Sequence, residues 1–134
     1  MIGKIPEDML EIVLETIPIE FSIVDKDDKV FAWNKHETRL FKRPLSVIGK
    51  DVHNCHPKKS VHKVEQILRE MKEGKRDKAR FWIELSLDPS QKKQKVLIEY
   101  YALRDSNGNY VGCLEATQNI TEIQGLKGEK RLLD

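Results

Sequence analysis

The chain has 134 residues, of which 39% are hydrophobic and 34% are charged, and its formal net charge is +2 at pH 7. This length and composition are typical of one globular domain with a single core, and they exclude an intrinsically disordered chain. Because the charges nearly balance, we expect binding neither to nucleic acid nor to a membrane surface. No apolar run approaches the ~20 residues that span a bilayer, and no secretion signal is visible. We therefore expect a cytoplasmic protein with reduced cysteines.

The N-terminal third predicts a helix followed by a hairpin. Residues 6–16, PEDMLEIVLET, begin with a proline and two acidic residues that suit a first helical turn, and their apolar side chains form one stripe. Pro18 ends this amphipathic helix. Residues 19–25 and 29–34 surround a KDD turn and are predicted to be paired strands. Short helical pieces, interrupted by proline and glycine, are expected over residues 35–57.

The second half predicts one long helix and three strands. Residues 60–74, SVHKVEQILREMKEG, form the clearest helical pattern, with Ser60 as the expected N-cap and Gly74 as the stop signal. The predicted strands are residues 80–87, 95–104 and 110–118. The order of elements indicates an α+β domain with one sheet covered on one face by helices.

Both faces of the last strands carry apolar residues. One face of the strand at 80–87, which we expect to point at the helices, carries Phe81, Ile83, Leu85 and Leu87. Apolar residues on the other face indicate that the outer side of the sheet is covered too. The N-terminal amphipathic helix could provide that cover within its own chain or across a dimer, and the sequence leaves both alternatives open.

Three stretches carry a resemblance to a known family. They are IVDKDDKVFAWNK at 23–35, FKRPLSVIGKDV at 41–52 and YALRDSNGNYVGCLEATQNIT at 101–121. In this order and spacing they resemble a PAS domain. The resemblance implies a PAS fold: a five-stranded antiparallel sheet, helices over one face, and a small cavity between them. The core is then expected at 18–121, after an N-terminal helix (1–17) and before a C-terminal tail (122–134).

Three shorter motifs resemble a subgroup of prokaryotic PAS domains, those that accompany hemerythrin-like cation-binding domains. The motifs are CHP at 55–57, SVH at 60–62 and GEKRLL at 128–133. Membership of the family implies a sensory or interaction module rather than an enzyme. The residues agree, since neither a nucleophile elbow nor a phosphate-binding glycine loop is present.

The resemblance implies a small, largely apolar ligand inside the domain and a homodimer formed through the N-terminal helix and the outer sheet face. By face and by fold analogy, the expected ligand-binding residues are Trp33, Phe41, Cys55, His56, Val64, Leu68, Phe81, Ile83, Ile98 and Tyr100. The alternative is an interaction module without a ligand, whose core is filled by its own side chains.

The segment VHNCHPKKSVH at 52–62 raises the question of a cofactor. Haem-binding PAS domains commonly use a histidine near or on the long helix, which makes His53, His56 and His62 the haem candidates. The helical period places His62 opposite the apolar arc of its helix, which disfavours it. Flavin is disfavoured because Cys55 lies three positions later than the cysteine of the flavin-binding motif. We expect no structural metal, since there is no Cys-x-x-Cys pair.

The simplest interpretation of the same segment is a junction between a loop and a helix. In that interpretation His56 hydrogen-bonds a backbone carbonyl and holds the turn. A second polar residue, Glu115, alternates with Cys113 and Thr117 on one face of the last strand. We expect Glu115 to face solvent or to pair with a lysine. The alternative is a carboxylate inside the domain, satisfied by a donor group of a ligand.

Overall fold

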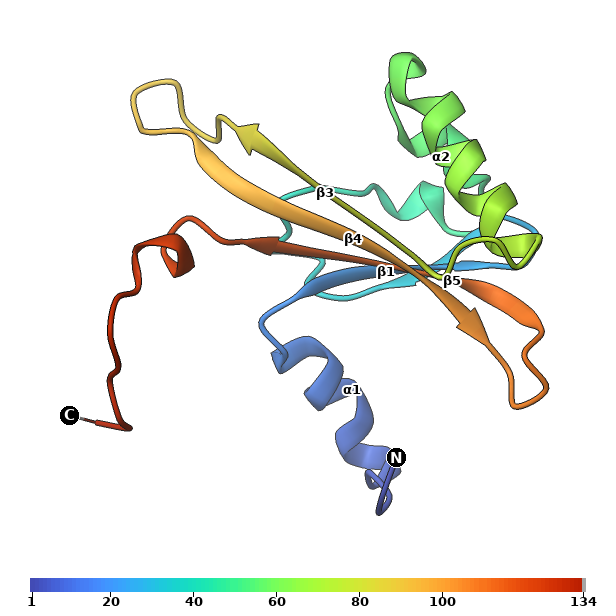
Figure 1. Ribbon diagram of the computed structural model, residues 1–134, viewed down its shortest axis with the longest axis horizontal. Coiled ribbons are helices and arrows are strands. Elements are labelled where there is room, and N and C mark those ends of the chain that lie inside the picture. The colour runs from blue at the N-terminus through green and yellow to red at the C-terminus, as the bar shows by residue number, and fades with distance from the viewer. Residues whose placement is uncertain (134) are drawn as a thin grey trace.

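The computed structural model describes residues 1–133, except for the side chains of residues 54 and 55, and it places five antiparallel strands in one sheet (Figure 1). The helices and strands are α1 (Glu7–Thr16), β1 (Glu20–Asp25), β2 (Val30–Trp33), α2 (Lys58–Lys72), β3 (Lys78–Leu85), β4 (Gln94–Arg104) and β5 (Tyr110–Asn119). Short 3₁₀ helices are η1 (Leu45–Val47), η2 (Val52–Cys55) and η3 (Ile123–Gly125). The predicted fold class is confirmed.

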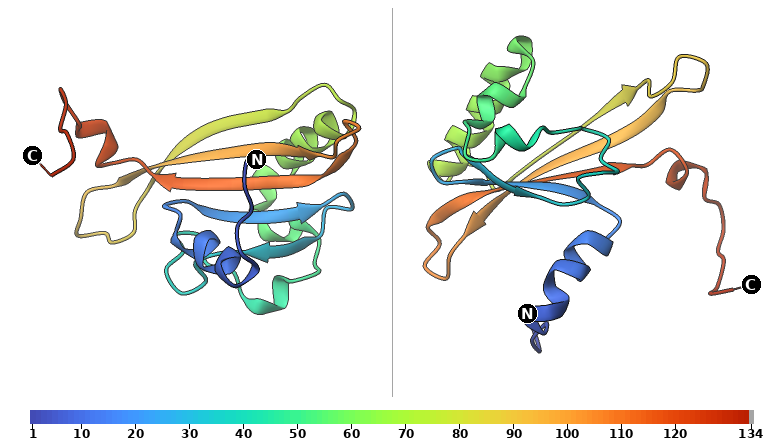
Figure 2. Two further views of the ribbon diagram at one scale, coloured as in Figure 1. Left: turned by 90° about the horizontal axis from the view of Figure 1, so that it is seen from below. Right: turned by 180° about the vertical axis from the view of Figure 1, so that it is seen from behind.

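The strand order is β2-β1-β5-β4-β3, so the first and last strands in the chain lie side by side in the middle of the sheet. The chain between β2 and β3 carries η1, η2 and α2 across one side of the sheet (Figures 1 and 2). Residues far apart in sequence therefore meet on that side, which is the side that holds the site described below.

The start of α2 differs from the prediction. The helix begins at Lys58, with Pro57 in the N-cap position, and in the described chain no side chain caps its first turn. Ser60 lies inside that turn and donates its backbone N–H to the carbonyl of Pro57 (2.8 Å). The predicted capping role of Ser60 is therefore wrong. Pro57 lacks an N–H and has a fixed φ, so it can precede a helix without leaving a donor unsatisfied.

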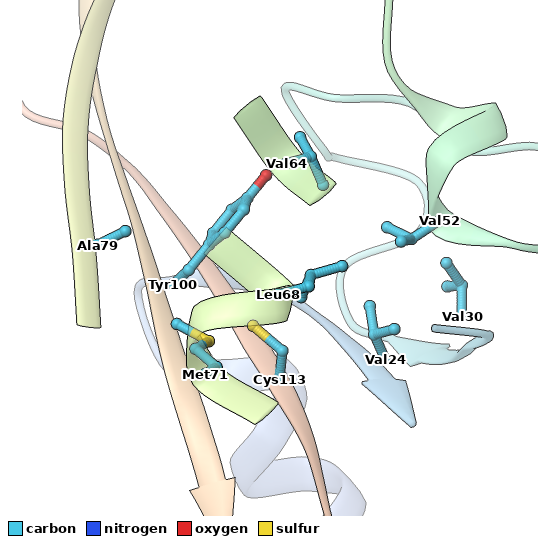
Figure 3. Close-up of a cluster of buried hydrophobic side chains, with 9 residues drawn as sticks. All are labelled: Val24, Val30, Val52, Val64, Leu68, Met71, Ala79, Tyr100 and Cys113. Atoms are coloured by element: carbon cyan, nitrogen blue, oxygen red, sulfur yellow. The ribbon is translucent and has the colours of Figure 1, made fainter. Parts of the chain in front are cut away.

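The main core lies between α2 and the sheet. The side chains of Val64, Leu68 and Met71, spaced as one helical stripe, are buried on α2. They face the buried side chains of the strands and of η2, including Val24 and Cys113 (Figure 3). This packing holds α2 and the segment before it against the sheet.

The helix α1 lies on the opposite side of the sheet and extends away from it (Figures 1 and 2). Its apolar side chains are exposed, including Met9, Leu10, Ile12 and Leu14. The helix is held at its C-terminal end, where the Nδ2 of buried Asn34 donates to the carbonyls of Leu14 (2.8 Å) and Ile19 (2.9 Å). The sequence left open whether this helix covers its own sheet or that of a second copy. In the structure α1 does not cover its own sheet.

The far end of the β3–β4 hairpin extends beyond α2 (Figure 1). Ile83 pairs with Val96 and is 38% exposed, while Leu87 follows the end of β3 and is 54% exposed. The expectation that the whole apolar face at 81–87 meets the helices is therefore wrong at this end, because α2 covers the other end of the sheet. Within residues 1–133, no helix has the length and apolar character needed to cross a membrane.

Candidate functional site: a buried polar cluster on the helix-covered face

A row of register partners crosses all five strands on the face covered by α2. Partners that lie directly opposite each other in a sheet project from the same face. In order across the sheet, the row comprises Trp33, Ser22, Glu115, Tyr100 and Ala79. Its three central members are polar and almost fully buried, with exposed fractions of 1% for Ser22, 7% for Glu115 and 3% for Tyr100. Polar side chains in such a position require partners.

Arg43, from the segment between β2 and η1, reaches the middle of this row. Its Nε donates to Ser22 Oγ (3.0 Å) and its Nη2 donates to Glu115 Oε2 (3.1 Å). The ion pair is shielded from solvent, since the side chains of Arg43 and Glu115 are 11% and 8% exposed. Arg43 thus links two central strands to the segment that covers them.

A second arginine stabilises the same segment. Arg39 donates from Nη2 to Ser22 Oγ (3.1 Å) and lies 3.5 Å from a carboxylate oxygen of Glu20. That carboxylate also accepts the backbone N–H groups of Leu40 (2.6 Å) and Phe41 (3.2 Å). Two arginines and two glutamates therefore balance inside the domain, as buried charges must.

His56 and Tyr100 form the other half of the cluster. The Nδ1 of His56 lies 3.1 Å from the carbonyl of Val52, and its Nε2 lies 3.2 Å from the Tyr100 hydroxyl. A carbonyl only accepts, so Nδ1 carries the hydrogen, and in the neutral ring Nε2 accepts from the hydroxyl. Burial, and then the charge of Glu115, raise the pKa of Tyr100 well above its usual value, so it stays an O–H donor.

One atom in the cluster remains unsatisfied. Glu115 Oε1 is buried and has no hydrogen-bond partner among the residues that the structure describes. Burial raises the pKa of the Glu115 carboxyl, against the opposing effects of Arg43, His56 and Arg39. The expectation that Glu115 faces solvent or pairs with a lysine is wrong. Its partner is an arginine, and the carboxylate lies inside the domain, as the alternative had it.

A family model described as a PAS domain matches residues 10–121. The chain belongs to the PAS domain family. PAS domains are sensory modules typical of signalling proteins. No curated protein matches the chain.

Solved structures show the same fold. A C-terminal domain from Streptococcus mutans is similar over 95% of this chain and 94% of its own, with 29% identity and a TM-score of 0.82. The PAS domain of BvgS from Bordetella pertussis is 16% identical, covers 88% of each chain and has a TM-score of 0.63. A PAS domain from Colwellia psychrerythraea is 16% identical over 86% of this chain and 97% of its own, with a TM-score of 0.61.

The structure brings most of the expected ligand-binding residues of this PAS domain close to the core. Val64, Leu68 and Tyr100 belong to the buried core. Partly buried side chains packed against it are Trp33, Phe81 and Ile98. Phe41 is half-buried beside Arg39, and Ile83 lies at the uncovered end of the sheet. The side chain of Cys55 falls outside the described residues.

The sequence analysis missed the arginines that complete the cluster. Arg39 and Arg43 are separated by only three residues, but nothing in their local pattern shows that they enter the interior. A signal was present in β1, where Glu20 and Ser22 alternate with apolar neighbours. Polar residues on one side of a strand next to two arginines could have suggested a buried network.

The three histidines of the 52–62 segment lie in different environments. His53 pairs with Asp51 and has Nε2 3.9 Å from a carboxylate oxygen of Glu65. His62 is exposed on α2, as the helical period predicts. The ring of His56 reaches the interior, and its bond to the Val52 carbonyl confirms the expected turn-holding role. In the part of the chain with described side chains, no group of three or more His, Cys, Asp and Glu residues could hold a metal.

Two surface hollows of the PAS domain lie away from the cluster. The larger, of about 370 Å³, is lined by Glu84, Lys92, Lys93, Lys95, Thr121, Gln124 and Gly125. The other, of about 310 Å³, is lined by Glu15, Lys35, His36, Glu37 and Thr38. None of the ten expected ligand residues is among the residues lining these two hollows.

Proposed function

We propose that this PAS domain is a sensory module that binds a small molecule between the sheet and α2, beside Glu115. The observation that carries the proposal is the buried Glu115 Oε1, which has no partner within the described part of the chain, while Arg43, His56 and Tyr100 around it are bonded. An unsatisfied buried polar atom costs about 1–3 kcal/mol. A ligand that supplies the missing hydrogen bond would remove this cost. The buried apolar side chains between α2 and the sheet, such as Val64 and Leu68, support a ligand that is otherwise largely apolar.

A ligand at this position would act on the segment that Arg43 belongs to. Arg43 joins Ser22 on β1 and Glu115 on β5 to the chain between β2 and η1. A molecule that contacts Glu115 would change this ion pair, and the segment could then move relative to the sheet. Such a change is the kind of differential contact that a signal requires.

The output would be a change in pairing with a second copy. The outer side of the sheet exposes Trp82 (63%), and α1 exposes Ile12 (61%) beside other apolar residues. Exposed apolar surface of this kind supports a homodimer through α1 and the outer sheet face. The same surface also favours the second candidate function, an interaction module without a ligand.

Two finer assignments follow from the sequence motifs. The Cys55-His56-Pro57 turn and the ending at residues 128–133 support a PAS domain that accompanies a hemerythrin-like cation-binding domain. Haem-based sensing, if it occurs, would use His56, because its ring reaches the interior beside Tyr100. His56 would first have to give up its bond to Tyr100. A Soret band after haemin addition, lost in His56→Ala and kept in His62→Ala, would support haem sensing.

Native mass spectrometry of the gently purified protein tests ligand binding. We expect a mass above that of the polypeptide, which is released on denaturation and reduced in Glu115→Gln. The matched control is Glu122→Gln, which removes an exposed carboxylate just beyond β5. If the protein carries no compound, a thermal-shift screen of small molecules follows. Bare polypeptide together with no stabilising compound would contradict the proposal.

A further inference from the structure

We propose that the bound molecule is neutral and presents an N–H or O–H donor to Glu115 Oε1, as a lactam, another secondary amide or a hydroxylated heterocycle would. This inference rests on the proposed function and specifies the chemistry of the ligand at the same site. Three observations support it: the kind of hydrogen-bonding atom left over, the balance of charge, and the surroundings of the free oxygen.

The buried polar atom left over beside Arg43 is an acceptor. Among the residues that the structure describes, Glu115 Oε1 has no partner, and a carboxylate oxygen accepts. With the His56 ring neutral, the Tyr100 hydroxyl donates its single hydrogen to His56 Nε2, so its oxygen can offer only lone pairs. Ser22 Oγ already accepts from both Arg39 and Arg43, so its lone pairs are used and only its hydroxyl hydrogen could meet a ligand. A ligand therefore gains most by bringing a donor, and an acceptor aimed at Oε1 would be repelled.

The charges of the cluster are already balanced, which disfavours a charged ligand. Arg39 pairs with Glu20 and Arg43 pairs with Glu115, and these four side chains are between 3% and 11% exposed. A cation placed at Oε1 would also lie near the Arg43 guanidinium, and an anion would lie beside the Glu115 carboxylate. Either ion would lose its hydration without gaining a free counter-charge. A neutral donor avoids this cost.

The residues around the cluster indicate the chemical character of the rest of the ligand. The Tyr100 hydroxyl points toward the Val64 end of α2 (Figure 3). Leu68 and Val52 lie further along the same apolar interior and are buried. The ring of Phe81 packs edge-on against Tyr100, with centroids 5.4 Å apart. Because these neighbours are apolar or aromatic, they favour a mostly apolar ring with one donor over a flexible polar chain.

Two probes of nearly the same shape test the donor. One is 2-pyrrolidone, a lactam with one N–H, and the other is N-methyl-2-pyrrolidone, which keeps the ring and the carbonyl but has no donor. Each is titrated into ¹⁵N-labelled protein, with the amide signals of Ser22, Tyr100 and Glu115 followed. We expect 2-pyrrolidone to bind on the order of tenfold more tightly, as for a site that loses one hydrogen bond to a charged group. Pyrrolidine, protonated at neutral pH, should bind more weakly than the lactam.

The Glu115→Gln variant supplies the matched control. Its amide oxygen can still accept from Arg43, and its NH₂ group then replaces the free acceptor with a donor. The preference for 2-pyrrolidone should disappear or reverse in this variant, whose fold is checked from its amide spectrum. Equal binding of both lactams, unchanged by Glu115→Gln, would overturn the donor inference and leave the proposed function intact. Failure of every probe to shift these signals would overturn the inference. An unoccupied protein in the native mass spectrum, together with no stabilising compound in the thermal-shift screen, would separately remove the proposed function.

Discussion

Glu115 of β5 and Tyr100 of β4 are register partners whose side chains are both buried on the α2 side of the sheet. Arg43 reaches Glu115 from the segment after β2, and His56 reaches Tyr100 from the end of η2. This pair of neighbours therefore joins the central strands to both parts of the chain that cover them. The contribution of each side chain can be measured by a separate substitution.

Glu115 should make the stability of the domain depend on pH. Burial raises the pKa of its carboxyl in the native state, so the native protein keeps this proton to a higher pH than the unfolded chain does. The favourable contribution is complete below the unfolded value, near 4.5, and is lost as the pH rises through the raised native value. Urea unfolding of wild type and Glu115→Gln between pH 4 and 8 measures the difference. We expect wild type to lose stability relative to the variant as the pH rises, and a constant difference would contradict this.

Replacing Tyr100 by phenylalanine should destabilise the domain by about 1–2 kcal/mol, because His56 Nε2 would lose its buried donor. Tyr110→Phe is the matched control, since the Tyr110 hydroxyl is buried without a partner among the described residues. Its removal should be neutral or stabilising. Chemical denaturation of both variants gives the two values. Equal losses would mean that the Tyr100–His56 bond contributes nothing specific.

Leu68 anchors α2 in the core and is 1% exposed. Leu68→Ala should cost about 2–5 kcal/mol through lost burial and the cavity left behind. Leu10→Ala, on the exposed face of α1, should change stability by less than about 0.5 kcal/mol in the monomer. Thermal or urea unfolding at low protein concentration checks both. A small effect at Leu68 would argue that α2 is not held by this packing.

The exposed apolar surface of α1 predicts self-association. Sedimentation of wild type should show a concentration-dependent dimer, and Ile12→Lys should shift the equilibrium toward monomer, because it places a charge among apolar side chains. Glu11→Lys introduces the same lysine side chain at the neighbouring exposed position. It controls for the effect of added positive charge without the loss of an apolar side chain. A wild-type protein that stays monomeric at all concentrations would rule out the dimer through α1.

The strands and the long helix could be predicted because their signals are local. The apolar spacing of Val64, Leu68 and Met71 describes one face of a helix without knowledge of its partner. The run of β-forming residues at 95–104 similarly describes β4. The order and spacing of these elements, with the three longer motifs, were enough to predict the PAS fold. The start of α2 was missed because serine is a common N-cap residue, so Ser60 was favoured over Pro57, which occupies the N-cap position in the structure.

The face of β1 that turns inward was decided by tertiary structure. Its apolar residues Phe21 and Ile23 alternate with Glu20 and Ser22, so local hydrophobicity would place the apolar pair toward the helices. The pairing of Ser22 with Glu115 turns the polar pair inward instead, and Phe21 is buried on the other face. The alternation of residues along a strand shows which side chains share a face. The register with the neighbouring strands determines which of the two faces is buried.

By itself, the sequence determined the elements, their order and the family to which the chain belongs, because periodicity and motif spacing are properties of neighbouring residues. Only the tertiary structure decided that Arg43 pairs with Glu115, 72 positions away, and that Glu115 Oε1 finds no partner among the described side chains. The two residues become neighbours when β5 inserts between β1 and β4 and the segment after β2 folds over them. A buried ion pair between residues far apart in sequence depends on the tertiary fold, so no local sequence pattern predicts it.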